Sequence, residues 1–404
     1  MSRATATAGN PAPPTLRQSL RALPRSVWVL FLGTFINRFG TFVVPFLALY
    51  LIDRGFTKME AGLAVSTYGI GHLFASIIGG HLADTLGRRQ TILLSMVASA
   101  VTMVAFSQAA TYPVILTLAF LAGLATEVYR PASSALLTDL VAPEHRVTAF
   151  VGYRIAINAG FAFGPAVAGW LAAKSFYWLF IGDAVTSVIF GIITLVALPA
   201  GVSLSKTQPI GWRGALNTIR RDRRFLRVLA ASFLAGLIFM QMSTTLGMEI
   251  ARHGYSTGVF GWILSLNGIL IVLIELPLTS WVRRFPTLRL MALGYLLCGL
   301  GFGMNALGGT IPWFVLAMTV FTFGEMISLP VGAAYIAELA PSEMRGRYNG
   351  VNGLTWALAL IIGPSTGMAL FTWNPNALWL ASAMCGLGAA VILSRGAKAP
   401  SITP

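Results

Sequence analysis

Six charged side chains lie inside long apolar stretches of this sequence, where a charge is costly. They are Arg38, Glu127, Arg130, Asp183, Glu275 and Glu325. Placing a charge at the centre of a bilayer costs about 2.5–3.5 kcal/mol on insertion scales, so such residues are candidates for function. In apolar surroundings a carboxyl group favours its neutral form, and it can take up a proton on one side of a barrier and release it on the other. We expect Glu127 and Glu325, followed by Asp183, to couple proton movement to transport.

Helical spacing limits how these groups can interact. Glu127 and Arg130 are three residues apart, so they share one face of a helix. Two roles are open for them: a pair that takes part in transport, or a pair that only neutralises charge. Arg38 lies in the middle of its apolar stretch. Asp183 can pair with Arg38 or with a backbone turn.

The residues predicted to line a substrate cavity combine polar and charged groups with two adaptable apolar ones. They are Asn37, Arg38, Arg130, Gln241, Asn267, Glu275, Phe239 and Met242. Methionine and aromatic surfaces adapt to varied apolar ligands. The alternative, which is favoured for any single one of these residues, is lipid-facing or interhelical packing. Glu275 lies near the end of its stretch, where a charged side chain can snorkel or serve as a gate. We interpret Arg154 as structural, paired with Asp139 or Glu127.

The composition indicates a chain that crosses a membrane many times. Of 404 residues, 56% are hydrophobic and 10% are charged, and the mean hydropathy is +0.75. Soluble domains carry about 25% charged residues. A spanning helix needs about 20 apolar residues, so the chain has room for roughly twelve. The predicted spans are 27–51, 61–82, 90–109, 113–137, 147–171, 175–199, 226–248, 259–281, 289–307, 312–337, 350–370 and 376–394.

The net charge of +15 is an orientation signal. Most basic residues fall on one side of the predicted spans, and the opposite side holds only Arg54, Lys58, Lys174 and Arg252. The positive-inside rule places the basic side, with both termini, in the cytoplasm. The same charges attract anionic lipid. A nucleic-acid partner is not expected, because no soluble basic domain exists to bind one.

Catalytic and metal-binding patterns are lacking in the sequence. Cys298 and Cys385 both lie in apolar stretches, and the four histidines are scattered without ligand spacing. We therefore expect no disulfide, no metal, no cofactor and no enzymatic activity. The polar start of the chain lacks an apolar segment followed by a cleavage site, so no cleaved signal peptide is expected.

The two halves of the chain resemble each other at an offset of 198–199 residues. Glu127 corresponds to Glu325, and Gly164-Pro165 corresponds to Gly363-Pro364. Such a repeat predicts two six-helix bundles related by a pseudo-two-fold axis. The expected organisation is a cytoplasmic tail (1–25), a first bundle (26–199), a basic linker helix on the cytoplasmic face (200–225), a second bundle (226–395) and a second cytoplasmic tail (396–404).

A short polar break, Gly80-His81-Leu82-Ala83-Asp84-Thr85-Leu86-Gly87-Arg88-Arg89, separates the second and third spans. It resembles the loop between helices 2 and 3 of the major facilitator superfamily, G-x-L-a-D-r-x-G-r-r, and departs from it at Thr85. The resemblance implies twelve helices in two bundles with a substrate site near the midplane. It also implies that Gly80, Asp84, Gly87, Arg88 and Arg89 form a conformational gate that latches the two halves. We expect Asp84 to pair at the helix ends, and Arg88 and Arg89 to face lipid headgroups and cytoplasm. A simple basic turn is the alternative.

A second pattern lies in the fifth span, where Gly160, Gly164, Pro165 and Gly169 are spaced as in the antiporter motif of that family, with Ala168 at one glycine position. Small residues let helices approach closely, and proline loosens a helix. Ordinary small-residue packing is the alternative. The arginine that many drug:proton antiporters carry four residues before a glycine in span four is Ala119 here.

The sequence thus predicts an all-α membrane protein resembling the bacterial twelve-helix drug:proton antiporters. Its expected function is proton-coupled export of amphipathic or lipophilic molecules by alternating access, as a monomer in the bacterial inner membrane. The expected partners are a small-molecule substrate, protons and membrane lipid. The alternative is a transporter dedicated to one solute class, such as a lysolipid, peptide, siderophore or sugar, acting by uptake, export or facilitated diffusion. A channel would need a continuous pore in place of a two-bundle repeat.

Overall fold

The computed structural model describes residues 21–142, 145–199, 218–282, 285–341 and 344–395. Within these residues the chain is helical and contains no strand. Twelve helical segments are long and apolar enough to cross a membrane, which confirms the predicted all-α architecture. Residues 1–20 of the first predicted tail, the whole second tail and most of the predicted linker helix lie outside the described residues.

The first half of the chain forms one bundle. Its helices are α2 (Arg25–Phe39), α3 (Val43–Asp53), α4 (Lys58–Thr85), α5 (Arg88–Ser107), α6 (Tyr112–Glu127), α7 (Tyr129–Leu140), α8 (Arg146–Lys174) and α9 (Tyr177–Ala197). The second half forms the other bundle. Its elements are α11 (Arg223–Ser243), α12 (Thr245–Arg252), α13 (Thr257–Val282), α14 (Thr287–Gly303), the short 3₁₀ turn η2 (Met304–Ala306), α15 (Ile311–Leu339), α16 (Arg345–Trp373) and α17 (Pro375–Ser394).

Two helix breaks in the first bundle follow from proline. The predicted continuous spans 27–51 and 113–137 are each divided, at residues 40–42 and at Val128. Pro45 lies four residues after Thr41, and Pro131 lies four residues after Glu127. A proline cannot donate to the carbonyl four residues earlier, and its ring crowds that carbonyl. The breaks therefore fall where the helical hydrogen bond is missing.

A third break divides the predicted span 226–248 at Thr244, between α11 and α12. Here hydroxyl side chains compete for the helix carbonyls: Oγ1 of Thr244 donates to the Met240 carbonyl at 2.8 Å, and Oγ1 of Thr245 donates to the Gln241 carbonyl at 3.5 Å. Back-bonding of this kind bends helices. After the break, α12 continues to Arg252, beyond the predicted end of the span at residue 248.

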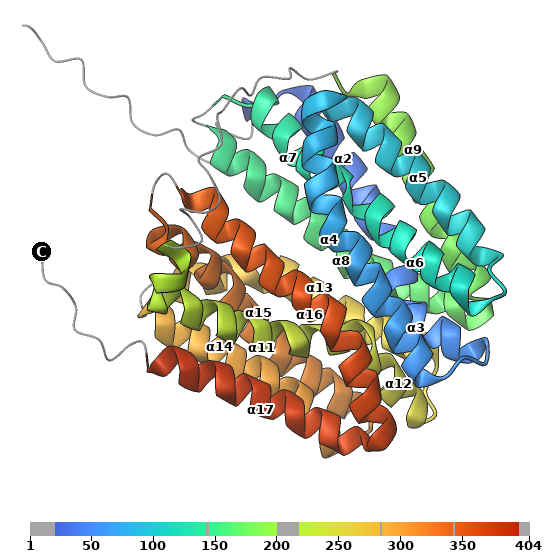
Figure 1. Ribbon diagram of the computed structural model, residues 1–404, viewed down its shortest axis with the longest axis vertical. Coiled ribbons are helices and arrows are strands. Elements are labelled where there is room, and N and C mark those ends of the chain that lie inside the picture. Colours follow the sequence, from blue (N-terminus) through green and yellow to red (C-terminus); the bar gives the residue numbers. More distant parts are fainter. Residues whose placement is uncertain (1–20, 143–144, 200–217, 283–284, 342–343, 396–404) are drawn as a thin grey trace, which may run out of the picture.

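The bundles are joined along two pairs of helices, α8 with α13 and α4 with α16. Glycines make the contact possible, since a Cβ at Gly169 would lie 2.6 Å from the Thr257 carbonyl oxygen, and one at Gly69 would lie 2.8 Å from that of Leu360. Figure 1 shows the bundles meeting near α3 and α12 and spreading apart toward the ends at which α7 finishes and α16 starts. The molecule is thus closed at one end of the helices.

Aromatic side chains strengthen the closed end. Phe46 of α3 and Phe260 of α13 are fully buried, and their ring centroids lie 5.0 Å apart in an edge-to-face arrangement. They belong to the largest apolar cluster, which continues from one bundle into the other. The hydrophobic core therefore crosses the boundary between the two halves at this end.

The start of the second bundle is anchored by Asp222. Its Oδ1 accepts hydrogen bonds from the backbone N–H groups of Arg224 and Phe225, both at 3.0 Å, and so caps α11. The Tyr348 hydroxyl of α16 donates to Oδ2 at 3.1 Å. Residues 218–221 before this cap are helical, and they are the only part of the predicted linker helix that precedes Asp222 and is described.

Candidate functional site

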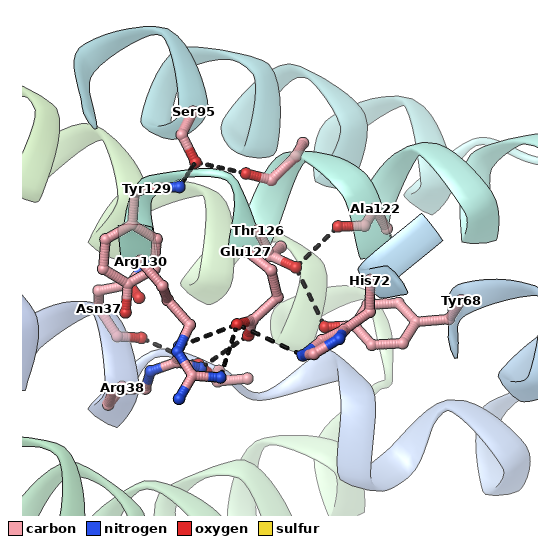
Figure 2. Close-up of polar contacts among 12 residues, drawn as sticks. Asn37, Arg38, Tyr68, His72, Ser95, Ala122, Thr126, Glu127, Tyr129 and Arg130 are labelled. Carbon is pink, nitrogen blue, oxygen red and sulfur yellow. Dashed lines mark hydrogen bonds and ion pairs between the residues drawn. The ribbon is translucent and has the colours of Figure 1, made fainter. Parts of the chain in front are cut away.

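In the first bundle, Glu127 is surrounded by cationic and potentially cationic groups. Nη1 and Nη2 of Arg38 donate to its two carboxylate oxygens at 3.0 and 3.4 Å. Nη1 of Arg130 donates at 3.1 Å, and Nε2 of His72 lies 3.5 Å from Oε2. Figure 2 shows these side chains converging from different helices on the one carboxylate. The pairing of Glu127 with Arg130 that the spacing predicted is present.

The helix breaks place the two buried partners. Arg38 lies at the end of α2 and Glu127 at the end of α6, and their side chains are each 7% exposed. The Arg38 guanidinium also lies over the rings of Tyr129 and Phe161, at 5.5 and 5.8 Å from their centroids. Guanidinium groups are attracted to aromatic faces. The Arg38 guanidinium is therefore held both by the Glu127 carboxylate and by two aromatic rings.

Further polar contacts hold the walls around this cluster. The hydroxyls of Tyr68 and Thr126 share a hydrogen bond of 3.0 Å, which connects α4 with α6 next to Glu127. Nδ2 of Asn37 donates to Sδ of Met96 at 3.6 Å. These contacts stay within the first bundle, and they favour a structural role for the cluster.

Asp183 is buried on α9 and lies close to the backbone N–H groups of Phe42 and Val43, where α3 begins. Its Oδ2 has no hydrogen-bond partner among the described residues. Of the two alternatives, the backbone turn is the one found, because Arg38 binds Glu127. Asp183 thus lies at the break in the first span.

The second bundle presents Glu325 in different surroundings. Nδ2 of Asn267 donates to its Oε2 at 2.8 Å and to Oγ1 of Thr322 at 3.0 Å. Glu325 and Asn267 belong to α15 and α13. No ion pair joins Glu325 to a basic side chain of the described residues. This carboxylate is held by a neutral donor.

Glu325 lines a cavity of about 560 Å³ between the two bundles. The walls come from α8, α13 and α15, and they are mostly aliphatic: Val151, Ile155, Ile271, Val272, Met326, Leu329, Pro330 and Ala333. The polar lining consists of Arg154, Asn158, Glu275 and Glu325. A site of this size with an apolar lining and a few polar groups is typical of small-molecule binding.

Arg154 and Glu275 form an ion pair across this cavity. Arg154 is on α8 of the first bundle and Glu275 is on α13 of the second. The expected pairing of Arg154 with Asp139 or Glu127 is therefore wrong. Asp139 instead lies 3.4 Å from Nε of Arg88, because the start of α5 packs beside α7.

Several residues predicted for the cavity lie elsewhere in this conformation. Phe239 is 8% exposed, and its ring packs edge-to-face on Phe321 at 4.9 Å. Met242 packs against the same apolar cluster. Nε2 of Gln241 donates to the Gly363 carbonyl at 3.2 Å and so connects α11 with α16. Arg38 and Arg130 bind Glu127, and Asn37 binds Met96 in the wall beside it. Asn267 does not line the cavity itself but binds Glu325, which does.

The gate motif differs from its expected exposure. Arg88 is 6% exposed, and it pairs with Asp84 at 2.7 Å in place of facing lipid headgroups. It also donates to the Ala83 carbonyl at 2.5 Å. Arg89 donates to the Leu195 carbonyl of α9. Arg88 is buried because of the turn at Gly87, whose φ of 97° directs the start of α5 back over the end of α4.

The remaining glycines of the two motifs differ in how closely they are packed. A Cβ at Gly80 would meet nothing within 4 Å, so close packing does not require glycine there. A Cβ at Gly160 or Gly164 would lie 2.6 Å from Arg38 Cβ or 2.5 Å from the Phe39 carbonyl oxygen. These two glycines thus seat the end of α2 on α8. Beyond Pro165, the backbone N–H of Ala166 donates to Oγ of Ser265 at 2.9 Å and joins the bundles.

One buried charge escaped the sequence reasoning. Glu249 of α12 is fully buried, and its carboxylate binds Nη2 of Arg252 at 2.5 Å and Nε2 of His253 at 3.1 Å. It was missed because the predicted span ended at residue 248, one position earlier. The signal was the spacing, since Arg252 and His253 follow Glu249 by three and four residues on one helical face.

Comparison with known proteins agrees with this architecture. The family model described as Major Facilitator Superfamily matches residues 30–364 and 243–403. A Na(+), Li(+), K(+)/H(+) antiporter of Planococcus maritimus is 29% identical, over 84% of this chain and 88% of its own length. Multidrug resistance protein MdtH of Aeromonas hydrophila is 25% identical, over 91% and 94%. A crystal structure of the peptide transporter POT is 20% identical and superposes with a TM-score of 0.80 over 96% of this chain and 98% of its own.

Proposed function

The chain belongs to the Major Facilitator Superfamily, and on that premise we propose that it is a proton-coupled secondary transporter that exports amphipathic or lipophilic molecules by alternating access. Family membership and the twelve apolar helices make it an integral membrane protein that transports a small-molecule substrate. The proposal adds the proton, the direction and the chemical class of that substrate.

The observation that carries the proposal is the position of Glu325. It is a carboxylate in the cavity between the bundles, and its hydrogen-bond partner among the described residues is a neutral amide. A carboxyl group without a close cation changes protonation more readily than one held in an ion pair. We therefore assign proton coupling to Glu325.

The surroundings of Glu127 make it less suited to proton coupling than Glu325. Its carboxylate is paired with Arg38 and Arg130, so protonation would leave two guanidinium groups without their counter-charge. Asp183 lies at the backbone turn of the first span and does not line the cavity. We therefore rank Glu127 and Asp183 below Glu325 as candidates for proton coupling.

The cavity lining supports an amphipathic substrate. Aliphatic side chains of α8 and α13 face a small set of charged groups, and methionine is present at Met326. Methionine fills irregular contacts with varied ligands. The similarity to a multidrug resistance protein and to a cation/proton antiporter supports export and proton exchange.

The membrane side follows from the basic residues. The bundles spread apart at the end at which α5 starts, and α5 begins with Arg88 and Arg89. The positive-inside rule places that end in the cytoplasm. We therefore propose a conformation open to the cytoplasm, with both termini on that side, in the bacterial inner membrane. In this orientation substrate would enter the cavity from the cell interior and leave on the opposite side.

The test uses proteoliposomes with a pH-sensitive dye inside and an imposed proton gradient. Lipophilic cations, lysolipids, sugars and peptides are added in turn to the native protein, to Glu325→Gln and to Glu338→Gln. Glu338 is a matched control, because it is an exposed glutamate near the end of the same helix. Proton movement triggered by several unrelated amphipaths, lost in Glu325→Gln and kept in Glu338→Gln, is the expected result.

Other outcomes would replace the proposal. A response to a single compound class would favour the dedicated transporter. Substrate movement without proton movement would indicate a facilitator. Proton movement that persists in Glu325→Gln would exclude Glu325 as the coupling residue.

A further inference from the structure

The ion pair of Arg154 and Glu275 is a direct electrostatic connection between the two bundles, and it lies in the cavity that holds Glu325. Beyond this pair, toward the closed end, α8 and α13 are in backbone contact: a Cβ at Gly268 would lie 2.4 Å from Ala162 Cα. The helix pair therefore separates between residues 162 and 154 of α8, and the ion pair spans the opening.

One cation serves two carboxylates at this place. Arg154 is bound to Glu275 and also interacts electrostatically with Glu325. Among the described residues, the buried thiol of Cys298 on α14 also interacts electrostatically with Glu325. None of the described residues that line the cavity belongs to α11 or α16. The charge balance of the site therefore depends on the proton of Glu325.

The two partners of the ion pair differ in freedom. The Arg154 side chain is 52% exposed, whereas that of Glu275 is 13% exposed. An arginine keeps its charge at every physiological pH, and its long side chain lets the guanidinium move between neighbouring acceptors. Asn267, by contrast, holds the Glu325 carboxylate in place. Arg154 is thus the mobile member of the group.

We propose that Arg154 is a coupling residue shared by Glu275 and Glu325, so that the ion pair between the bundles is strong when Glu325 is protonated and weakened when Glu325 is ionised. The inference rests on the proposed function. With Glu325 neutral, Glu275 is the one ionised carboxylate left among the described residues that line the cavity. Once Glu325 loses its proton, the two carboxylates compete for one guanidinium. Loading the proton therefore changes a contact that belongs to both halves of the molecule.

The test measures the protonation of Glu325 directly. Infrared difference spectra of the purified full-length protein, recorded against pH, follow the carbonyl band of protonated carboxyl groups, and Glu325→Gln identifies the band of Glu325. The variants are Arg154→Gln and Glu275→Gln. Arg54→Gln is the matched control, because it removes an exposed arginine of the same bundle far along the chain from the cavity residues.

The expected shifts are opposite in sign. Arg154→Gln removes the cation that favours ionised Glu325, so the midpoint of the Glu325 titration should move to higher pH by about one unit. Glu275→Gln removes the competing carboxylate and frees Arg154 for Glu325, so the midpoint moves to lower pH by about one unit. Arg54→Gln leaves it unchanged. Midpoints of the Glu325 titration that stay in place, or that move in the same direction in both variants, would overturn the inference.

Two further arms keep the result decisive. Arg154→Lys and Glu275→Asp keep the charges, and they should titrate close to the native protein even if the glutamine variants fold poorly. The spectra need no substrate, so a native protein that moves no protons in vesicles would refute the proposed function while opposite shifts would still support the shared cation. Glu325-dependent proton movement without opposite shifts would refute only the sharing of Arg154.

Discussion

Glu127 and Glu325 occupy matching positions in the two halves of the chain, yet their surroundings differ. Glu127 is bound by two arginines and approached by a histidine, all from its own bundle. Glu325 is bound by an asparagine and faces the cavity between the bundles. The same residue at the same place in the repeat therefore lies in an ion-pair cluster in one half and accepts a hydrogen bond from a neutral amide in the other; we propose that only the second one takes up the coupled proton.

A few positions of the repeat produce this difference. At the offset of 198 residues, Ser328 stands where the first half has Arg130. The Ser328 hydroxyl donates to the Gly324 carbonyl of its own helix at 2.7 Å. At the offset of 199 residues, Asn267 stands where the first half has Tyr68. The second half thus lacks the counter-charge and supplies a neutral donor in its place.

The largest expected effect of breaking this contrast is on folding in the first bundle. Glu127→Gln leaves Arg38 buried without its counter-charge, and removing one partner of a buried pair costs about 3–5 kcal/mol. SDS titration in mixed micelles, with the helical circular dichroism as readout, measures the free energy of unfolding. Arg38→Met combined with Glu127→Leu should lose less, because both charges are removed. Native stability of Glu127→Gln would contradict the assignment of Glu127 as a neutraliser.

The corresponding change in the second bundle should affect transport and leave folding nearly intact. Glu325→Gln keeps an acceptor for Asn267 and leaves Arg154 paired with Glu275, so its unfolding free energy should stay within about 1 kcal/mol of the native value. Accumulation driven by a proton gradient should fall to the level of empty vesicles, while substrate counterflow persists. A loss of both would mean that Glu325 is needed for binding or folding and not for proton coupling alone.

A smaller effect is expected at Asn267. Asn267→Leu removes the donor to Glu325, and we expect a loss of about 1–2 kcal/mol of stability. The ionised form of Glu325 loses its hydrogen bond, so the pH at which proton-driven transport is half-maximal should move upward. The measurement is the pH profile of transport in vesicles. A downward movement would show that Asn267 stabilises the protonated form.

The smallest effect is expected at the matching position of the first bundle. Tyr68→Phe removes one hydroxyl, while Thr126 still donates to the Ala122 carbonyl at 2.7 Å. The expected loss is about 0.5–1 kcal/mol, with the pH profile of transport unchanged. Unfolding in mixed micelles and the vesicle assay measure the two quantities. A pH shift as large as that of Asn267→Leu would remove the contrast between the two halves.

The sequence by itself determined the features that depend on local composition. Twelve apolar stretches, the repeat and the charged residues within the stretches all follow from one dimension, because a spanning helix must be apolar over about 20 residues. The pair Glu127 and Arg130 was also accessible, since three residues along a helix bring side chains together. Even the breaks near Pro45 and Pro131 had a local cause, although the predicted spans passed over them.

Only the tertiary structure decided which charges meet. Arg38 and Glu127 are 89 residues apart in the chain, and Arg154 and Glu275 belong to different bundles. The burial of Arg88 likewise depends on how α5 turns over α4 and packs beside α7. The physical reason is that an ion pair requires contact within about 4 Å, and for distant residues that contact is set by helix packing and not by spacing along the chain.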